Sequence, residues 1–472
     1  MIRRWGQTVS CPHDIILGGN HMEQQVTLPD MLDARERRAF RQQELLAAYQ
    51  TPLVCFTMNI AGPVKNNALI RRGFHLGKRY LRERMDALKI RPVYFEEMEA
   101  HTGNEACYLI DLPPLALKSL TSDIEDESLA GRLFDLDVLR PDGTKIDRTE
   151  LGLPPRRCLI CGGPAKECAR SRTHTVEELQ DKTTRILKQA LAEADARDVA
   201  RLACRALLYE VGTTPKPGLV DRFNSGSHTD MDFFTFMDSA SALWPYFETC
   251  TRIGRETAAA PPPDTFLALR QAGRKAEADM LAATRGVNTH KGAIFSMGIV
   301  CAALGRLERE CWTNTNDVLD LCAAMTKGLT SSDFAGLTEE TACTTGEKLY
   351  LQYGIRGVRG QMEDGLPAVR KVGLPVLKEG IARGLSLNDA GCAALLAIIV
   401  HSADTNMIAR SDPDTYQETS ARLQALLART PYPDRQALEK LDTAFIQANL
   451  SPGGSADLLA ICYLLYFLEH EV

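Results

Sequence analysis

The sequence lacks an apolar run long enough to cross a membrane. Its longest apolar runs, Ala390–Val400 and Leu458–Leu468, fall well short of the roughly 20 residues that a spanning helix needs. The first residues, MIRRWGQTVSCPHD, have none of the apolar core of a signal peptide. We therefore predict a cytoplasmic protein that does not interact with a membrane.

Positive charge in excess and a disulfide framework are also missing. The formal net charge of -6 argues against general binding to nucleic acid. The 14 cysteines are scattered and follow no disulfide spacing. Several lie in apolar, helix-periodic sequence, namely Cys204, Cys301, Cys322, Cys392 and Cys462. This pattern predicts reduced, buried thiols.

The length and the sequence pattern predict two domains. A chain of 472 residues exceeds one ordinary core, and 44% hydrophobic with 25% charged residues is typical of a globular protein. We expect a disordered extension over residues 1–24, a mixed α+β domain over 25–180, and a bridging helix over 181–196. Residues 197–472 consist of long apolar or amphipathic segments without strand alternation, which predicts an all-α domain.

A basic helix opens the first domain. The segment DARERRAFRQQELLAAY, residues 33–49, has a capping box formed by Asp33 and Glu36. Four arginines follow the cap, namely Arg35, Arg37, Arg38 and Arg41. They predict either a solvated basic face or a dock for an acidic partner.

The sharpest pattern of the first half is a D-x-D strand. Leu133–Leu139 alternates so that Asp135 and Asp137 share one face. Two carboxylates placed in this way can hold Mg²⁺. A two-residue loop at Asp142-Gly143 would pair Leu139 with Ile146 and bring Arg148 opposite Asp137. The alternative is a hairpin whose polar face is simply wet.

A cysteine and histidine cluster follows. Cys158, Cys161, Cys168 and His174 have the character of zinc ligands. Their spacing, C-x2-C-x6-C-x5-H, is not a standard finger signature. The alternative interpretation is a set of reduced thiols beside a surface histidine.

Charge-dense stretches interrupt the apolar helices of the second half. EVGTTPKPGLVDRFNSGSHTDMD, residues 210–232, cannot be one helix because Pro215 and Pro217 break it. Similar clusters occupy residues 285–292 and 401–406, with a weaker one over 346–360. Taken singly, each can be a structural loop, but together they predict a shared charged cleft for a polyphosphate ligand.

The quoted motifs resemble two known families joined in one chain. Residues from about 25 to 180 resemble citrate lyase holo-acyl-carrier-protein synthase, also called apo-citrate lyase phosphoribosyl-dephospho-CoA transferase. The matching segments are MNIAGPVKNNALIRRGF, GRLFDLDV and LPPRRCLICGGPAKECARSRTH. Residues from about 190 to 472 resemble triphosphoribosyl-dephospho-CoA synthase, through the stretch at 210–232, GVNTHKGAIFSMG, YGIRGVRGQ and the loop at 404–406.

The resemblance implies two transferase reactions and a nucleotidyltransferase-like fold for the first domain. ATP and 3'-dephospho-CoA would give 2'-(5''-triphosphoribosyl)-3'-dephospho-CoA and adenine. The phosphoribosyl-dephospho-CoA would then move to a serine of the citrate lyase acyl carrier subunit, with release of pyrophosphate. A malonate decarboxylase carrier is an alternative acceptor. A Cys/His metal-binding adaptor on a helical scaffold is an alternative of another class.

The same resemblance implies roles for particular residues. In the first domain Asp135 and Asp137 would hold Mg²⁺, and Lys65, Arg132 and Arg148 would contact phosphate oxygens. Candidates for base or Mg²⁺ ligand in the second domain are Asp221, His228, Asp230 and Asp232. Substrate and triphosphate would be bound by Lys216, Arg222, Asn288, His290, Lys291, Asp404 and Asn406. The basic helix would dock the acidic carrier.

Overall fold

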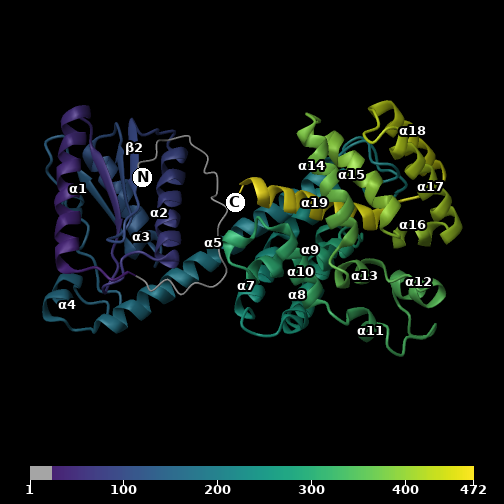
Figure 1. The fold of residues 1–472 in the computed structure, drawn as a ribbon, viewed down its shortest axis with the longest axis horizontal. Coiled ribbons are helices and arrows are strands. Elements are labelled where there is room, and N and C mark those ends of the chain that lie inside the picture. Colours follow the sequence, from purple (N-terminus) through teal and green to yellow (C-terminus); the bar gives the residue numbers. More distant parts are fainter. Residues whose placement is uncertain (1–23, 472) are drawn as a thin grey trace. The chain divides into compact units, whose positions relative to one another are not determined.

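The computed structural model describes residues 24–471 and divides the chain into two compact units, residues 1–191 and 192–472 (Figure 1). The extension predicted for residues 1–24 lies almost wholly outside the described residues. No helix among the described residues combines the length and the apolar content needed to cross a membrane.

The first unit is built on a four-stranded antiparallel sheet with the order β2-β3-β1-β4. Its strands are β1 (Leu53–Met58), β2 (Tyr94–Met98), β3 (Glu105–Leu109) and β4 (Phe134–Leu139). Its main helices are α1 (Leu28–Tyr49), α2 (Ala68–Ala87) and α3 (Pro114–Glu127), and its short elements are η1 (Gly131–Leu133), η2 (Arg148–Leu151) and α4 (Ala165–Ser171). The strand predicted over residues 133–139 is therefore present.

Helices cover both faces of this sheet, as Figure 1 shows for α1 and α2. On one face Leu45 and Leu46 of α1 pack against Leu53 and the neighbouring strand side chains. On the other face Phe56 of β1 stacks on Phe74 of α2, with ring centroids 4.7 Å apart. The alternation of β4 sends Phe134, Leu136 and Val138 to the α2 and α3 side, so its two aspartates lie with Leu139 on the α1 side.

Helix α5 (Val176–Gly212) begins in the first unit and ends in the second. The residues predicted to bridge the two domains, 181–196, lie inside it. The helix starts with Thr175, whose hydroxyl accepts from the Glu178 N–H (3.1 Å) while the Glu178 carboxylate accepts from the Thr175 N–H (2.9 Å). This is the capping box of a helix start.

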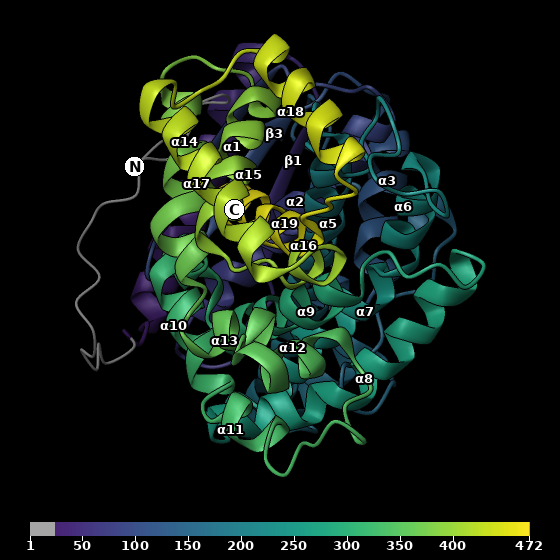
Figure 2. The same cartoon turned by 90° about the vertical axis from the view of Figure 1, so that its right-hand side faces the viewer.

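The second unit is helical throughout its described residues. Its first helices are α6 (Phe233–Ala242), α7 (Trp244–Glu256), α8 (Pro262–Ala283), α9 (Lys291–Arg306), η3 (Arg309–Cys311), α10 (Thr315–Met325), α11 (Leu329–Asp333) and α12 (Thr345–Tyr353). The remainder are α13 (Gly357–Glu363), the π-helical turn η4 (Val369–Gly373), α14 (Leu374–Ala382), α15 (Leu387–His401), α16 (Thr405–Arg410), α17 (Pro413–Arg429), α18 (Arg435–Gln447) and α19 (Gly453–Glu471). Helices α11 to α13 gather at one end of the unit and α14, α17 and α18 at the other (Figures 1 and 2).

The core of the second unit is formed by α9, α15 and α19, which are buried along most of their length. Helix α7 approaches α9 so closely that a Cβ at Gly254 would lie 2.0 Å from the Ala302 carbonyl oxygen. Glycine is therefore required at this crossing. The small residues of α9 give this close helix packing, and its polar start is held at the edge of the core.

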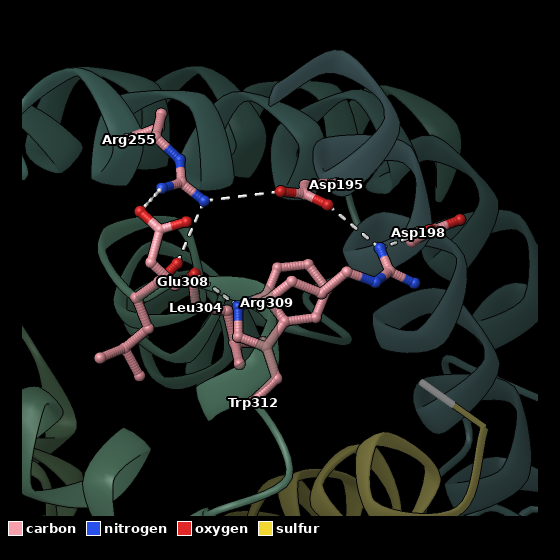
Figure 3. A network of polar contacts seen from close by, with 8 residues as sticks. Asp195, Asp198, Arg255, Leu304, Glu308, Arg309 and Trp312 are labelled. Atoms are coloured by element: carbon pink, nitrogen blue, oxygen red, sulfur yellow. Dashed lines mark hydrogen bonds and ion pairs between the residues drawn. The ribbon is translucent and has the colours of Figure 1, made fainter. Parts of the chain in front are cut away.

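A polar network fixes the beginning of the second unit (Figure 3). Asp195 of α5 is nearly buried and accepts from Arg309 at 3.1 Å and from Arg255 of α7 at 3.5 Å. Asp198 accepts from Arg309 at 2.7 Å. The Arg309 guanidinium also lies 5.0 Å from the ring centroid of Trp312. The network ties the C-terminal half of α5 to α7 and to η3.

Candidate active sites

The first unit has a cavity of about 190 Å³ at the ends of β1 and β4. Its polar lining consists of Arg35, Arg38, Thr57, Asn59, Lys65, Thr102, Asn104 and Asp135. Cations and one carboxylate thus meet in a small concave site, which is what binding of a phosphorylated ligand needs.

Asp135 and Asp137 lie on the same face of β4, as the alternation predicts, but only Asp135 lines the cavity. Asp135 is opposite Thr57 in the sheet register, and Asp137 is opposite Cys55. Burial and then the charge of Asp137 raise the pKa of Asp135. Asp137 forms an ion pair with Lys145 at 2.6 Å. A cation between the two carboxylates would relieve their repulsion.

Lys65 enters the cavity from the loop before α2. Its Nζ donates to the Ile60 carbonyl oxygen at 2.5 Å. Burial, and then the positive charge of Arg35, lower the pKa of Lys65. An anionic ligand would offset both effects, so Lys65 and Arg35 are placed to receive phosphate oxygens.

The arginines of α1 do not form one solvated face. Arg38 pairs with Glu105 of β3 at 2.6 Å, and Arg41 pairs with Glu96 of β2 at 2.7 Å. Of the four, Arg37 is fully exposed and makes no such pair with the sheet. The prediction of a basic face is wrong for Arg38 and Arg41 because the sheet beneath α1 presents two glutamates to them, which the sequence of the helix cannot reveal.

The predicted hairpin register is wrong. Leu139 bridges to Lys145 rather than to Ile146, and the Arg140 N–H donates to the Thr144 carbonyl at 2.9 Å. The Asp142 carboxylate accepts from the Thr144 N–H at 2.9 Å and so holds a wider turn. Lys145 therefore takes the place beside Asp137 that was predicted for an arginine.

Arg148 and Arg132 consequently lie away from the cavity lining. Arg148 pairs with Asp126 of α3 at 2.5 Å. The Arg132 guanidinium donates to the Arg157 carbonyl oxygen. Both arginines serve the packing around β4, which is a different role from the predicted contact with phosphate.

Thr102 and Asn104 are among the cavity residues that sequence reasoning did not find. Thr102 is 4% exposed, and its Oγ1 has no partner among the described residues. Asn104 accepts from Asn66 Nδ2 at 3.0 Å. The segment that carries Thr102 and Asn104, HTGN, is an ordinary turn between two strands, so its local pattern gave no signal.

The four predicted metal ligands of the first unit come together. The ligand atoms of Cys158, Cys161, Cys168 and His174 all lie within 4.8 Å of one another. Hydrogen bonds from the Gly163 N–H, His174 and Cys168 lower the pKa of the Cys161 thiol to about 6. A thiolate is the form in which cysteine binds metal.

In the second unit the stretch at residues 210–232 is buried in its first half. Lys216 is 1% exposed, and its ammonium pairs with the Glu210 carboxylate. Asp221 accepts from the N–H groups of Lys216 (3.0 Å), Phe223 (2.7 Å) and Asn224 (3.0 Å). Asp221 thereby shapes the loop, and this use of both its oxygens differs from the free base that was predicted.

Neighbouring helices clamp this loop. Asp442 of α18 accepts from the Gly218 N–H at 2.9 Å and from Asn224 Nδ2 at 2.7 Å. Gly218, at φ +70°, leaves no room for a side chain because a Cβ would lie 2.1 Å from the Leu450 carbonyl oxygen. Arg222 is exposed and donates to Asn388 at 3.3 Å. The loop is a fixed part of the core.

The end of the stretch carries His228, Asp230 and Asp232, which have unlike environments. His228 Nε2 lies 2.8 Å from Ser451 Oγ, and its Nδ1 accepts from Arg410 at 3.2 Å. Burial and then Arg410 lower the pKa of His228. Asp230 is exposed, 3.8 Å from His228. Asp232 caps α6 by accepting from the Thr235 N–H at 2.9 Å, a structural use of a predicted catalytic residue.

His290 lies at the start of α9 and is 2% exposed. Its Nδ1 is 2.6 Å from Ser239 Oγ, which itself accepts from Thr289 at 2.8 Å. The direction of the Ser239–Nδ1 bond depends on the ring tautomer, because a serine hydroxyl can donate one hydrogen bond and accept two. The Nε2 of His290 is buried without a partner among the described residues. Burial and then the charge of Lys216 lower the pKa of His290 to about 3.

The neighbours of His290 in sequence point elsewhere. Asn288 is exposed, and Lys291 pairs with Glu277 of α8 at 3.0 Å. Glu277 lines a second cavity of about 290 Å³, together with Phe266 and Phe295. Lys291 is therefore associated with this second cavity, whereas His290 faces Lys216.

Asp404 caps α16 and is 2% exposed. Its Oδ1 accepts from the N–H groups of Asn406 (3.0 Å) and Met407 (3.1 Å). Its Oδ2 accepts from the N–H (2.6 Å) and the hydroxyl (2.8 Å) of Ser455. Asn406 packs against Gly453, where a Cβ would lie 2.7 Å from its Nδ2. Both predicted residues thus meet the start of α19.

The segment SPGGS, residues 451–455, and Asp457 were missed in the sequence. The segment contacts His228 at one end and Asp404 at the other. Asp457 lies against the start of α9, since a Cβ at Gly292 would be 2.0 Å from its Oδ2. Burial, and then the charges of Glu210 and Asp404, raise the pKa of Asp457 well above its ordinary value. A carboxylate in the apolar first half of this helix was the available signal.

In both units cations and carboxylates are gathered where a phosphorylated ligand can be held, which is the arrangement of an enzyme acting on nucleotides. A CitX family model, described as apo-citrate lyase phosphoribosyl-dephospho-CoA transferase, matches residues 26–190. A CitG family model, described as ATP:dephospho-CoA triphosphoribosyl transferase, matches residues 196–472.

Relatives match the chain along most of its length. The protein CitXG of Haemophilus influenzae is 36% identical over 460 residues, which cover 94% of this chain and 96% of the relative. The protein CitXG of Leuconostoc mesenteroides subsp. cremoris is 34% identical over 94% of this chain and 97% of its own. The 2-(5''-triphosphoribosyl)-3'-dephosphocoenzyme-A synthase of Pectobacterium atrosepticum is 42% identical over 58% of this chain and 90% of its own.

The chain belongs to the CitXG family, in which a CitX transferase and a CitG synthase are fused. It is a bifunctional transferase of the pathway that makes the citrate lyase prosthetic group, and ATP and dephospho-CoA fit as its substrates. Both families are transferases, so the alternative prediction of a metal-binding adaptor without enzymatic turnover is wrong.

Proposed function

We propose that each unit carries one of the two steps that make and attach the citrate lyase prosthetic group. In the second unit the 2'-hydroxyl of 3'-dephospho-CoA attacks C1 of the ATP ribose. The new O–C bond replaces the N–C bond to adenine, which leaves with a proton. In the first unit a serine of the acyl carrier subunit attacks the phosphorus nearest the ribose, and pyrophosphate leaves.

The observation that carries the assignment of the second unit is the set formed by the buried Lys216 and His290 and the partly buried Asp457. The Lys216 ammonium would offer positive charge to the triphosphate, and the His290 Nε2 is a buried nitrogen without a partner among the described residues. Cleavage of an N-glycosidic bond passes through an oxocarbenium-like state and needs a base for the incoming hydroxyl. The raised pKa of Asp457 suits that base.

Magnesium in the second unit is better placed near Glu210 and Asp457 than at the predicted pair of Asp230 and Asp232. Asp232 is occupied as a helix cap, and Asp230 is exposed. Asp457 feels the negative charge of Glu210 and of Asp404. A divalent cation held by Glu210 would relieve that repulsion and would supply positive charge to the triphosphate, while Asp457 stays uncoordinated as the base.

In the first unit we place Mg²⁺ between Asp135 and Asp137, in a fold of the nucleotidyltransferase kind. Lys65, Arg35 and the cavity beside them would hold the polyphosphate. The ion would neutralise charge that builds on the pyrophosphate as it leaves. The Thr102 hydroxyl, which has no partner among residues 24–471, is a further donor inside the same cavity.

Two assays on the full chain test this division of labour. One follows adenine release from ATP and dephospho-CoA, and the other follows pyrophosphate release from pre-made triphosphoribosyl-dephospho-CoA with apo acyl carrier subunit. Asp457→Asn should lower only the first rate, by about 10²–10⁴-fold, as expected for loss of a general base. Asp135→Asn should lower only the second, by about 10²–10³-fold, as for a lost electrostatic contact.

Matched controls are the exposed carboxylates Asp123 of the first unit and Asp264 of the second. Their Asn variants should keep both rates. Loss of both activities in one folded variant would refute the division of labour. Supplying the carrier subunits of citrate lyase and of malonate decarboxylase side by side tests the acceptor, and we expect modification of the citrate lyase subunit.

A further inference from the structure

The four-residue cluster formed by Cys158, Cys161, Cys168 and His174 has the dimensions of a closed metal site. A Zn–S bond of about 2.3 Å in a tetrahedron places two sulfurs about 3.8 Å apart. Here Cys161 Sγ and Cys168 Sγ are 3.5 Å apart, and no pair of ligand atoms exceeds 4.8 Å. A disulfide would need about 2.0 Å between its sulfurs. The separation matches shared coordination.

The backbone around the cluster is folded to present these side chains. The Cys158 N–H donates to the Gly163 carbonyl at 2.7 Å, and the Gly162 N–H donates back to the Cys158 carbonyl at 3.1 Å. Gly162, at φ +73°, makes this tight turn without strain. Cys168 then comes from α4, and the Thr173 N–H donates to its carbonyl at 3.1 Å, which returns the chain to His174.

His174 supplies an independent observation. Its Nε2 is buried and has no hydrogen-bond partner among the residues that the structure describes. A buried polar nitrogen without a partner is costly unless something occupies the space before it. One ring nitrogen of His174 belongs to the same group of converging ligand atoms as the three sulfurs.

We propose that Cys158, Cys161, Cys168 and His174 bind one structural Zn²⁺. Three thiolates and one imidazole are a complete tetrahedral set with no open position for substrate, which defines a structural rather than a catalytic zinc. A disulfide would use two of the thiols and leave the third thiol and the histidine unexplained. Soft sulfur ligands also exclude Mg²⁺, the ion proposed for the transfer step.

The site would hold the strand that carries Asp135. Arg156, two residues before Cys158, donates to the Phe134 carbonyl at 2.9 Å and pairs with Glu125. Glu125 in turn accepts from the Leu136 N–H at 2.8 Å. The residues on either side of Asp135 are therefore fastened to the segment that enters the zinc site. Arg156 is a positioning residue that acts through β4.

Metal analysis of the purified full chain tests the site without any assay of activity. Elemental analysis should find one zinc per chain, and Cys161→Ser and His174→Ala should each lose it. The matched control is Cys343→Ser, because Cys343 is an exposed thiol of the second unit and should keep the zinc. Cobalt bound to the stripped wild-type chain should show the charge-transfer absorption of thiolate ligands.

The proposal would be overturned by a wild-type chain without zinc that also fails to take up zinc or cobalt after reduction. It would be overturned equally by a Cys161–Cys168 disulfide in the freshly purified protein, found by mass spectrometry of unreduced peptides. If a variant fails to fold, the cobalt spectrum of the wild-type chain still decides. Zinc removal should slow pyrophosphate release and spare adenine release. A chain that holds zinc yet transfers nothing would contradict the proposed function and leave the zinc site standing.

Discussion

The two units collect their polar groups at different kinds of secondary structure. In the first unit the groups stand on strand ends, where Asp135 and Thr57 project from the sheet into a cavity. In the second unit they stand at helix starts, where Asp232 and Asp404 accept from backbone N–H groups and His290 is the residue before α9. Strand-borne side chains remain free for a ligand, whereas many helix-start side chains are already used by the backbone.

The two buried lysines show the same contrast in charge. Lys65 lies beside Arg35, and its cavity holds more cations than anions. Lys216 is enclosed and paired with Glu210. The first site therefore has an excess of positive charge that an anionic ligand would neutralise. In the second site the charge of Lys216 is already neutralised by Glu210 before any ligand binds.

The largest expected effect in this comparison concerns the two lysines and the free energy of unfolding. Lys216→Met leaves the Glu210 carboxylate buried without its partner and should cost about 3–5 kcal/mol. Lys65→Met removes a charge that its surroundings disfavour and should change stability by less than about 1 kcal/mol.

Tryptophan fluorescence in urea measures the change in the second unit, because Trp244 and Trp312 both lie there. A Trp5→Phe background removes the third tryptophan. Amide exchange reports the first unit. Equal losses for the two lysine variants would contradict the contrast, and the double variant Lys216→Met with Glu210→Gln should recover part of the lost stability.

Local patterns predicted much of the first site. Alternation along β4 placed Asp135 and Asp137 on one face because strand geometry is fixed by a period of two. The pairing of Arg38 with Glu105 was missed because it depends on which helix covers the sheet. The predicted hairpin register was wrong because the Thr144 N–H donates to the Asp142 carboxylate. This hydrogen bond holds a wider turn than the two-residue loop that an Asp-Gly pair suggests.

The residues of the second site were harder to predict because they are of the same types, and stand at the same positions, as ordinary helix caps. Asp232 is followed three residues later by Thr235, a capping pattern that was read as chemistry. Lys216 finds Glu210 across a proline-broken loop whose path no periodicity describes. Asp457 lies in the apolar first half of α19, and its contact with α9 depends on tertiary packing.

A smaller effect separates the two helix-capping aspartates of the second unit. Asp404→Ala removes an acceptor used by four donors in the core and should cost about 3 kcal/mol. Asp232→Ala removes an exposed cap and should cost about 1 kcal/mol while adenine release is kept. Urea midpoints of the same tryptophan signal give both values. If an Asp232→Ala variant folds well but releases no adenine, Asp232 is a catalytic residue and not only a helix cap.

The remaining effects are pH dependences, which we expect to have opposite sign for His290 and Asp135. The folded-state pKa of His290 is lowered from 6.5 to about 3. Between these two pH values His290 is protonated in the unfolded chain and neutral in the folded chain. The free energy of unfolding therefore falls as the pH falls. The slope is at most about 1.4 kcal/mol per pH unit. Urea unfolding at pH 7, 6 and 5 should show this loss in the wild type and a flatter profile in His290→Gln.

Asp135 supplies the opposite case in the first unit. Its folded-state pKa is raised by burial and by Asp137, so the folded chain keeps a proton that the unfolded chain has already released. Its contribution to stability is therefore lost as pH rises through the folded-state pKa. Amide exchange of β4 should show Asp135→Asn gaining protection over the wild type as pH increases. Added Mg²⁺ should cancel that difference in the wild type, because the ion stabilises the ionised carboxylate. If Mg²⁺ leaves it unchanged, the proposed metal position between Asp135 and Asp137 is wrong.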